Sequence, residues 1–240
     1  MLRSTWILER SIKPILLSGQ TPFPNPEHYD DQGLLAVGGD LSPQRLIDAY
    51  SQGIFPWYEP DQPILWWSPD PRMVLLPSEF KLSRSLSQSL KKQYHITMDK
   101  DFKAVIEACA SESGRTNQTW ITPEMIDAYT QLHQLGYAHS LEVWQQDKLI
   151  GGLYGISLGK AFFGESMFHR VRDGSKLAIY YLCEACKTWQ FDFIDCQLPT
   201  SHLESLGASP LSRHQFLQDL KAALKHPAKI GVWNYPSLEN

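Results

Sequence analysis

The chain has 240 residues, 42% of them apolar, so it can form one large domain or a medium domain with a small appendage. Its formal net charge of −4 excludes a protein that coats nucleic acid through charge alone, so any such contact must be local. Eleven of the sixteen prolines lie between Pro14 and Pro77, which predicts a small N-terminal domain over residues 1–71 and a more regular domain over residues 72–240.

The start of the chain and its cysteines indicate a compartment. MLRSTWILERSIKP lacks the apolar run of a signal peptide, and no stretch approaches the roughly 18 apolar residues of a membrane span. We therefore expect a cytoplasmic protein with no membrane contact and with reduced thiols. Three cysteines and one histidine could form a zinc set, but only one pair is closely spaced, which favours buried thiols and no metal. These residues are Cys183, Cys186, Cys196 and His202.

Capping residues and glycines mark the predicted helices in the first half of the chain. Proline at the first helical position strengthens two of these signals. The predicted helices are Pro43 to about Gln52 with Ser42 as cap and Gly53 as stop, a helix from the cap Asp99 to about Ala110, and Pro123 to Leu135 with Thr122 as cap and Gly136 as stop.

The stretch from Gly53 to Arg72 combines three tryptophans with five prolines. Proline fixes φ and removes a backbone donor, so the stretch cannot be one regular helix or a central strand. A stiff loop with flat aromatic faces suits the stacking of a nucleobase, which contributes roughly 1–3 kcal/mol per base. The alternative is a proline-braced packing corner between two domains.

The second half of the chain changes to strand periodicity. Three successive strands with short links predict an antiparallel meander: His139 to Trp144, Lys148 to Ser157 and Lys160 to Phe168. A helix from about Ser175 to Trp189 and an apolar strand from Phe191 to Leu198 follow, and then two short helices, the second opened by Ser212 and Gln215. This order predicts an α+β domain with a mostly antiparallel mixed sheet and one parallel crossover.

Polar side chains interrupt two of these apolar strands. Alternation places Glu165 on one face with Phe163 and Met167, where a carboxylate is costly to bury unless it meets a cation. Asp195 and Gln197 share a face at the end of the last strand, which indicates a site at the carboxyl edge of the sheet. Structural alternatives are an ion pair between Glu165 and an arginine at the core edge, and a helix cap for Asp195.

The blocks GGDLSP (residues 38–43), GIFPW (53–57), ILWWSPDPR (64–72), TWIT (119–122), GGLYG (151–155), GESMF (164–168) and DCQ (195–197) occur in this order. This series resembles the leucyl/phenylalanyl-tRNA–protein transferase family over roughly residues 20 to 225. The resemblance implies a small N-terminal α/β domain followed by a domain like that of the GNAT acyltransferases. It also implies transfer of Leu or Phe, and less well Met, from aminoacyl-tRNA to the N-terminal Arg or Lys of a protein, which marks that protein for degradation.

The resemblance also implies residue roles. Aromatic residues contact the terminal adenosine of the tRNA, or lie nearby: Trp57 and Trp120, with Tyr50 and Tyr129. An apolar pocket for the donor side chain includes Leu153, Phe162, Met167, Ile179 and Leu182. Glu165, Asp195 and Gln197 surround the attacking amine, and the first two face the acceptor's Arg or Lys.

The partners follow from the same resemblance and from charge. Arg84, Lys91 and Lys92 are expected to contact the tRNA backbone, although SLSQSLKK is less basic than the family's run there. A solvated helix face is the alternative for the basic stretch from Lys81 to Lys103. No cofactor or metal is expected, and the chain is expected to be a monomer.

Two other functions fit parts of the sequence. An acetyl-CoA-dependent GNAT enzyme requires a glycine-rich pyrophosphate loop, but HRVRDGSK has a single glycine. A non-catalytic module that binds the tRNA end would use Trp57 and Trp120, but it would leave Asp195 and Gln197 without a role.

Overall fold

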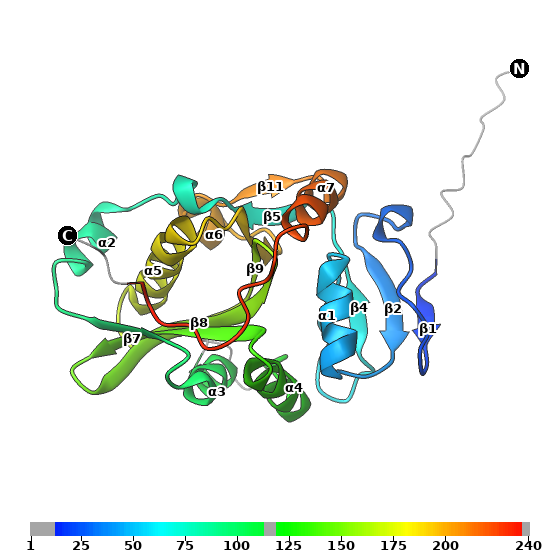
Figure 1. The fold of residues 1–240 in the computed structure, drawn as a ribbon, viewed down its shortest axis with the longest axis horizontal. Coiled ribbons are helices and arrows are strands. Elements are labelled where there is room, and N and C mark those ends of the chain that lie inside the picture. The colour runs from blue at the N-terminus through cyan, green and yellow to red at the C-terminus, as the bar shows by residue number, and fades with distance from the viewer. Residues whose placement is uncertain (1–12, 113–118, 237–240) are drawn as a thin grey trace, which may run out of the picture.

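The computed structural model describes residues 13–112 and 119–236. The prediction that the N-terminus is not a signal peptide depends mostly on residues 1–12, which lie outside the described residues. The described residues form two sheets flanked by helices (Figure 1). Within these residues no helix has the length and apolar character needed to span a membrane.

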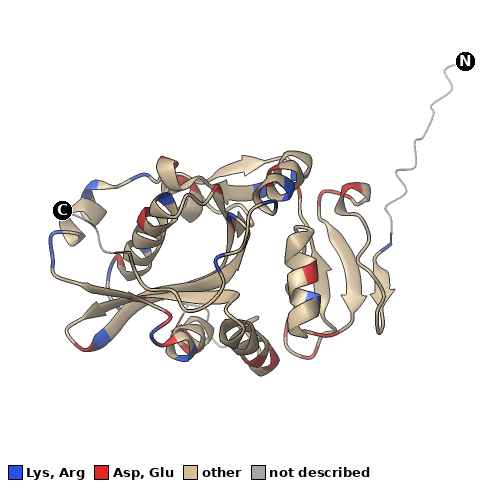
Figure 2. Ribbon diagram, viewed as in Figure 1, with Lys and Arg blue, Asp and Glu red and all other residues tan. Residues whose placement is uncertain are grey.

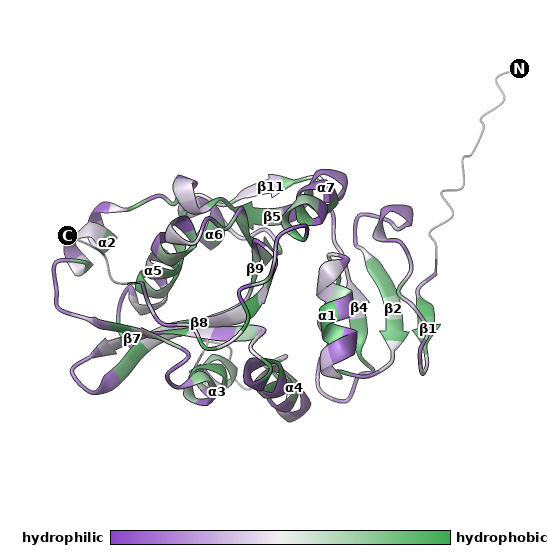
Figure 3. Ribbon diagram, in the orientation of Figure 1, coloured by the Kyte–Doolittle hydropathy of each residue, from purple (hydrophilic) through white to green (hydrophobic). Residues whose placement is uncertain are grey.

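The smaller sheet has the strand order β1-β2-β4-β3, and α1 (Pro43–Ser51) follows its second strand. Its strands are β1 (Ile15–Leu17), β2 (Leu34–Gly38), β3 (Phe55–Pro56) and β4 (Leu65–Trp67). Strands β1 and β2 carry mainly hydrophobic residues (Figure 3), and Leu35, Ala36 and Trp66 of this sheet are fully buried. The sequence patterns did not predict this sheet.

The larger sheet has the order β11-β5-β10-β9-β8-β7-β6, and only β9 and β10 pair in parallel. Its strands are β5 (Arg72–Leu75), β6 (His95–Met98), β7 (Ala138–Gln145), β8 (Lys148–Leu158), β9 (Ala161–His169), β10 (Phe193–Gln197) and β11 (Ser209–Leu211). The predicted meander, the parallel crossover and the α+β class are confirmed. Strands β5, β6 and β11 were not predicted.

Helices cover both faces of the larger sheet (Figure 1). One face packs against α3 (Phe102–Glu112), α4 (Pro123–Gln134) and α7 (Arg213–Ala223), and the other packs against α5 (Gly174–Thr188). Two shorter helices, α2 (Arg84–Ser89) and α6 (Ser201–Ser205), complete the set with 3₁₀ turns at Pro26–His28 and Pro77–Glu79. The hydrophobic core between the larger sheet and α3, α4 and α7 also contains Leu35 and Trp66 of the smaller sheet. This core is therefore continuous between the two sheets. The domain division at residue 71 stays a prediction.

Two predicted helix caps are wrong in detail. Ser42 precedes α1, but its side chain makes no capping hydrogen bond. Asp99 does not cap α3: Asp101 Oδ1 accepts from Ala104 N at 3.1 Å, while Asp99 is buried in a left-handed conformation with φ of 55°. Thr122 and Ser212 do cap α4 and α7 by accepting backbone N–H groups.

The stretch from Gly53 to Arg72 is part loop and part sheet. The short strands β3 and β4 pair antiparallel, and β4 also pairs with β2, so it is an interior strand. The stretch as a whole is neither one helix nor one strand, as predicted, but its proline-free residues 65–67 form a short interior strand. Trp66 is fully buried and donates from Nε1 to Gly38 O at 2.8 Å. The stretch thus braces a core and also exposes an aromatic ring, that of Trp57.

Candidate functional site

A cavity of about 940 Å³ lies where the smaller sheet meets the middle of β9 and the end of β10. The β3–β4 hairpin supplies one wall, and Thr119 and Trp120, which precede α4, supply a second. Glu165, Gln197 and the start of α6 complete the lining. Residues from four separated parts of the sequence therefore face one space.

The aromatic wall of the cavity contains three indoles, those of Trp57, Trp67 and Trp120. Trp57 is 41% exposed, and its ring centroid lies 6.0 Å from that of Trp67. Trp67 Nε1 donates to Trp57 O at 2.7 Å, which fixes the hairpin beneath the exposed ring. The structure thus brings together Trp57 and Trp120, the pair expected to contact an adenosine.

Glu165 lies at a β-bulge in β9. Tyr154 pairs with Ser166 and Gly155 pairs with Gly164, so Glu165 has no partner on β8 and its side chain reaches the cavity. A bulge of this kind redirects a side chain next to a functional site.

Two buried tyrosines hold the Glu165 carboxylate. Tyr50 Oη donates to Oε1 at 2.7 Å, and Tyr129 Oη donates to Oε2 at 3.1 Å. The two hydroxyl oxygens are 2.5 Å apart, so the three groups form one unit. Desolvation raises the pKa of Glu165 to about 7, although the tyrosine hydrogen bonds oppose that rise. Tyr50 and Tyr129, expected near the adenosine, are fully buried and instead support Glu165.

The bulge also overturns the predicted face of Met167. Phe163 and Phe168 belong to the core cluster on the α3–α4 face, whereas Phe162 and Met167 pack in the cluster under α5. One extra residue in the strand shifts the alternation, so Met167 is not on the face of Phe163 and Glu165.

The five residues expected to form the amino-acid pocket do lie together. They pack in the apolar cluster between the sheet and α5: Leu153, Phe162, Met167, Ile179 and Leu182. Met167 is partly exposed and the other four are buried. None of the five lines the cavity. The pairing of β9 with β10 ends at Phe163 and Asp195, so beyond these residues the two strands are no longer joined by ladder hydrogen bonds.

Arg72 and Asp195 form a fully buried ion pair beside the cavity. Arg72 Nε donates to Oδ1 at 2.8 Å and Nη2 donates to Oδ2 at 2.7 Å. Nη1 donates to Gly53 O at 3.1 Å, and the guanidinium lies over the Phe55 and Phe216 rings. Asp195 does not line the cavity, so in this geometry it contacts no acceptor.

Asp195 positions Gln197 through the backbone. Oδ1 of Asp195 accepts from Gln197 N at 2.9 Å, and Gln197 has a φ of 58° at a register shift in β10. Gln197 Nε2 lies 3.5 Å from Glu165 Oε1. An amide donor and a carboxylate therefore meet at the cavity, a pair that can hold an amine.

Arg72 is the residue that sequence reasoning missed. It ends the block ILWWSPDPR, but its partner Asp195 is 123 positions away. Its acidic neighbour in sequence, Asp70, accepts from Arg213 N instead, so the local sequence gives no signal for the partner of Arg72. Only the pairing of β5 with β10 brings the two side chains together.

The basic residues expected to contact tRNA lie outside the cavity. Arg84 begins α2, whose cap is Ser83, and Lys91 and Lys92 follow the helix; all three are exposed. Figure 2 shows Lys and Arg residues in the region of α2, on the opposite side of the view from α1. The stretch from Lys81 to Lys103 is not one solvated helix face, because it contains α2 and β6.

The cysteines show no sign of catalytic or metal chemistry. Burial raises the pKa of Cys183 to about 12 and that of Cys186 well above its ordinary value, which disfavours the thiolate. His202 lies on α6, and no group of three or more His, Cys, Asp or Glu suited to a metal occurs among the described residues.

Comparisons with known proteins identify a family for the chain. Residues 74–221 match the family described as leucyl/phenylalanyl-tRNA protein transferase, and residues 39–70 match its N-terminal domain. A relative from Legionella pneumophila (strain Corby), named leucyl/phenylalanyl-tRNA–protein transferase, is 61% identical over 212 residues, which cover 88% of this chain and 96% of the relative. One of the same name from Nitrosospira multiformis is 52% identical over 221 residues, 90% of this chain and 95% of the relative.

Solved structures are more distant. L-PGS from Bacillus licheniformis has a TM-score of 0.38 and 9% identity, covering 70% of this chain and 54% of that one. A GCN5-related N-acetyltransferase from Kribbella flavida has a TM-score of 0.33 and 8% identity, covering 68% and 58%. These scores are too low to support a conclusion. The family match and the close relatives are sufficient: the chain belongs to the leucyl/phenylalanyl-tRNA protein transferase family.

Proposed function

We propose that this protein transfers Leu or Phe, and less well Met, from aminoacyl-tRNA to the N-terminal Arg or Lys of acceptor proteins, and so marks them for degradation. One observation carries the proposal: the indoles of Trp57 and Trp120 share a cavity with Glu165 and Gln197. A nucleoside stacked on the indoles would present its esterified amino acid to the polar pair.

The proposed reaction requires the protein to position the acceptor amine at the donor ester more than to activate either group. The donor ester is already activated, so the acceptor's α-amino nitrogen attacks the ester carbonyl and the bond to the ribose oxygen breaks. The departing ribose oxygen takes up the proton that the amine loses. An α-amino group has a pKa of about 7.7–8.0, so a minor fraction is neutral at pH 7. Holding that fraction at the carbonyl is the protein's task.

Gln197 is suited to hold the amine. The Asp195 carboxylate accepts a hydrogen bond from the backbone N–H of Gln197 and is neutralised by Arg72. Gln197 is therefore held in place without leaving an unpaired charge in the core. Asp195 has both oxygens engaged, which argues against its acting as a general base. Proton transfer through the ribose hydroxyl fits this arrangement better.

Glu165 is suited to receive the side-chain cation of the acceptor. Its carboxylate reaches the cavity, and Tyr50 and Tyr129 hold it from behind. An incoming guanidinium or ammonium would favour the charged form of Glu165 and so lower its pKa from about 7. Selectivity for Arg or Lys at the acceptor N-terminus follows from that pairing.

The donor side chain would enter the apolar cluster under α5 between the separating strands β9 and β10. An apolar pocket discriminates one methylene by only about 1–3 kcal/mol, so acceptance of Leu, Phe and Met is natural. Outside the cavity, Arg84, Lys91 and Lys92 would contact tRNA phosphates. We further propose a cytoplasmic monomer.

The test is incubation with Phe-tRNA and a peptide that begins with Arg, followed by mass measurement. A gain of one Phe residue at the peptide's N-terminus supports the proposal. A matched peptide that begins with Asp should gain nothing, because its side chain would repel Glu165. An acetyl group gained from acetyl-CoA, or tight binding of Phe-tRNA without transfer, would instead support one of the two alternative functions.

A further inference from the structure

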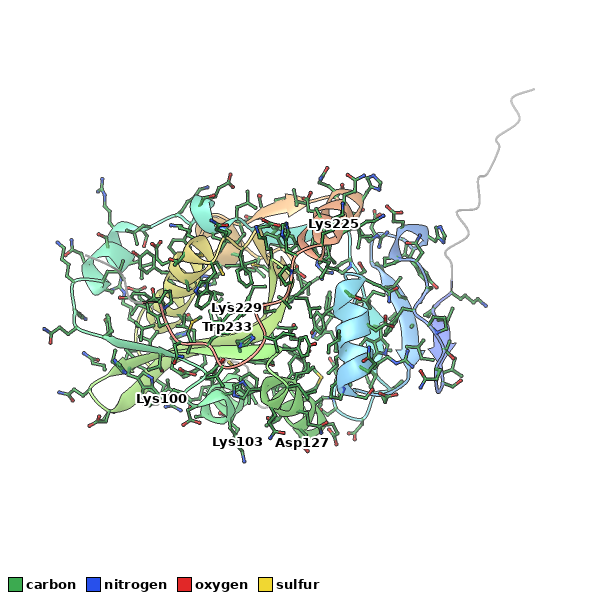
Figure 4. The ribbon with its side chains drawn as sticks, in the orientation of Figure 1. Lys100, Lys103, Asp127, Lys225, Lys229 and Trp233 are labelled. Carbon is green, nitrogen blue, oxygen red and sulfur yellow. The ribbon has the colours of Figure 1, made fainter. Side chains whose placement is uncertain are left out.

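The C-terminal segment of residues 224–236, here called the C-terminal strap, crosses the larger sheet after α7 (Figure 4). It lies beyond residue 221, where the family match ends. Trp233 is 1% exposed, although its neighbour Val232 is 75% exposed. The strap therefore inserts one large side chain into the protein and leaves the adjacent one in solvent.

Several contacts fix the position of Trp233. Its backbone N–H donates to Asp99 Oδ2 at 2.7 Å, and its indole Nε1 donates to Lys229 O at 2.8 Å. The indole stacks on His139, with ring centroids 3.7 Å apart and an angle of 9° between the planes. Asp99 also accepts from His139 Nδ1, so the strap and the start of β7 share one buried carboxylate.

Trp233 packs in the apolar cluster under α5. Its ring centroid lies 4.8 Å from Trp189, 5.8 Å from Phe191 and 6.0 Å from Phe162. Phe162 in turn belongs to the same cluster as Ile179 and Leu182, the residues proposed to receive the donor side chain. Trp233 thus lies behind a residue of the proposed pocket.

The exposure of the side chains differs across this cluster, which indicates the side from which a donor side chain would enter. Met167 is partly exposed and lies beyond Phe163, where the pairing of β9 with β10 ends, whereas Phe162 lies in the paired stretch and is 1% exposed. A donor side chain that enters between the strands reaches Met167 before Phe162. Because the cluster is closely packed, a long side chain needs Phe162 to move, and the rigidly held Trp233 limits that movement.

We propose that Trp233 is a specificity-determining positioning residue, which backs Phe162 and sets how far a donor side chain extends under α5. This inference rests on the proposed function and names a determinant of its donor choice. Trp233 does not line the cavity that contains Trp57, Glu165 and Gln197, so its effect should fall on the donor side chain alone.

The experiment compares kcat/KM for Leu-tRNA, Phe-tRNA and Trp-tRNA with one Arg-initiated peptide. In Trp233→Leu, the space behind Phe162 should raise the preference for Phe over Leu by about tenfold and make Trp-tRNA a donor. Trp233→Phe should shift the ratio in the same direction by less. Val232→Ala, an exposed change on the same strap, should leave the ratio unchanged.

A purely structural role for Trp233 would lower the rates for all donors together. The inference is overturned if the ratio of kcat/KM for Phe-tRNA to that for Leu-tRNA stays within about twofold of the parent value. This criterion applies to variants that unfold cooperatively and are therefore folded. If Trp233→Leu does not fold, Trp233→Phe decides by the same criterion. Absence of transfer by the parent chain would reject the proposed function, whereas transfer with an unmoved ratio rejects only the role of Trp233.

Discussion

Arg72 and Asp195 bind each other through two parallel hydrogen bonds with no solvent access, on the antiparallel strands β5 and β10. Such a pair gives geometric specificity as well as energy. It places the backbone of Gln197 while keeping the buried charge of Asp195 neutralised.

Removing the guanidinium should therefore destabilise the protein strongly. We expect Arg72→Met to lower the free energy of unfolding by about 3–5 kcal/mol, because Asp195 is left buried and unpaired. Urea unfolding measures this. The double variant Arg72→Met, Asp195→Leu should recover much of the stability without recovering transfer activity. Arg172→Met, at an 85% exposed side chain, is the control and should change little. Equal stability of the Arg72 variant and the control would contradict the assigned role.

Glu165 should make stability fall as pH rises. Its pKa is raised from 4.5 to about 7, so between these values the unfolded carboxyl ionises while the folded one keeps its proton. Glu165→Gln should match the parent near pH 4.5 and gain up to about 3 kcal/mol at pH 8. Urea unfolding at several pH values measures the difference. Glu112, whose pKa its hydrogen bond to Arg170 lowers, is the control, since Glu112→Gln should lose stability above pH 5. A pH-independent gain for Glu165→Gln would refute the mechanism.

The same carboxyl should control acceptor affinity. Above pH 7 Glu165 is ionised and attracts the acceptor cation, so the acceptor KM of the parent should fall as pH rises from 6 to 8. Glu165→Gln should raise the acceptor KM and remove this component of the pH profile, with a smaller effect on the KM for aminoacyl-tRNA. The α-amino group of the acceptor titrates in the same way with the parent and with Glu165→Gln. Its effect on KM therefore cancels when the two pH profiles are compared. Equal losses for both substrates would count against the role.

Gln197 should affect turnover more than donor binding. We expect Gln197→Ala to lower kcat by about 100-fold, a typical effect of losing a positioned group, with the KM for aminoacyl-tRNA nearly unchanged. Steady-state kinetics with Phe-tRNA measures both constants. Gln145→Ala, at an exposed position at the end of β7, is a matched change away from the site. Full turnover of Gln197→Ala would show that the orientation scheme is wrong.

Gly155 and Gly164 lie opposite each other beside the bulge, but only one of them should tolerate a methyl group. A Cβ on Gly155 would lie 2.2 Å from Phe163 O, whereas on Gly164 it would lie 3.6 Å from Asp195 O. Gly155→Ala should cost about 1–3 kcal/mol or more and impair transfer through displacement of Glu165. Gly164→Ala should remain close to the parent. Thermal unfolding compares the two, and similar melting temperatures would disprove the steric argument.

Long elements with clear caps could be predicted from the sequence. Thr122 and Gly136 delimit α4, and the alternation from residue 138 to 169 gave the meander, because these signals are local. Three strands of the smaller sheet, β1, β3 and β4, have only two or three residues, too few to show a period, so that sheet was missed.

The site was predictable as a set of residues but not as a set of contacts. Glu165 and Gln197 were identified by their polarity in apolar strands, and both line the cavity. The bulge that redirects Glu165 and Met167 depends on pairing with β8, which alternation along one strand does not reveal. The partner of Asp195 and the hydroxyls behind Glu165 come from distant segments, so no local pattern indicated them.

The N-terminal part does more than present indoles, because Tyr50 of α1 donates to a carboxylate on β9 of the other sheet. A chimera that borrowed residues 1–71 from a relative to alter its tRNA preference would also change the acidity of the carboxyl group that we propose binds the acceptor. On that proposal, recognition of the two substrates is linked through the Tyr50 hydroxyl, and neither should be engineered without measuring the other.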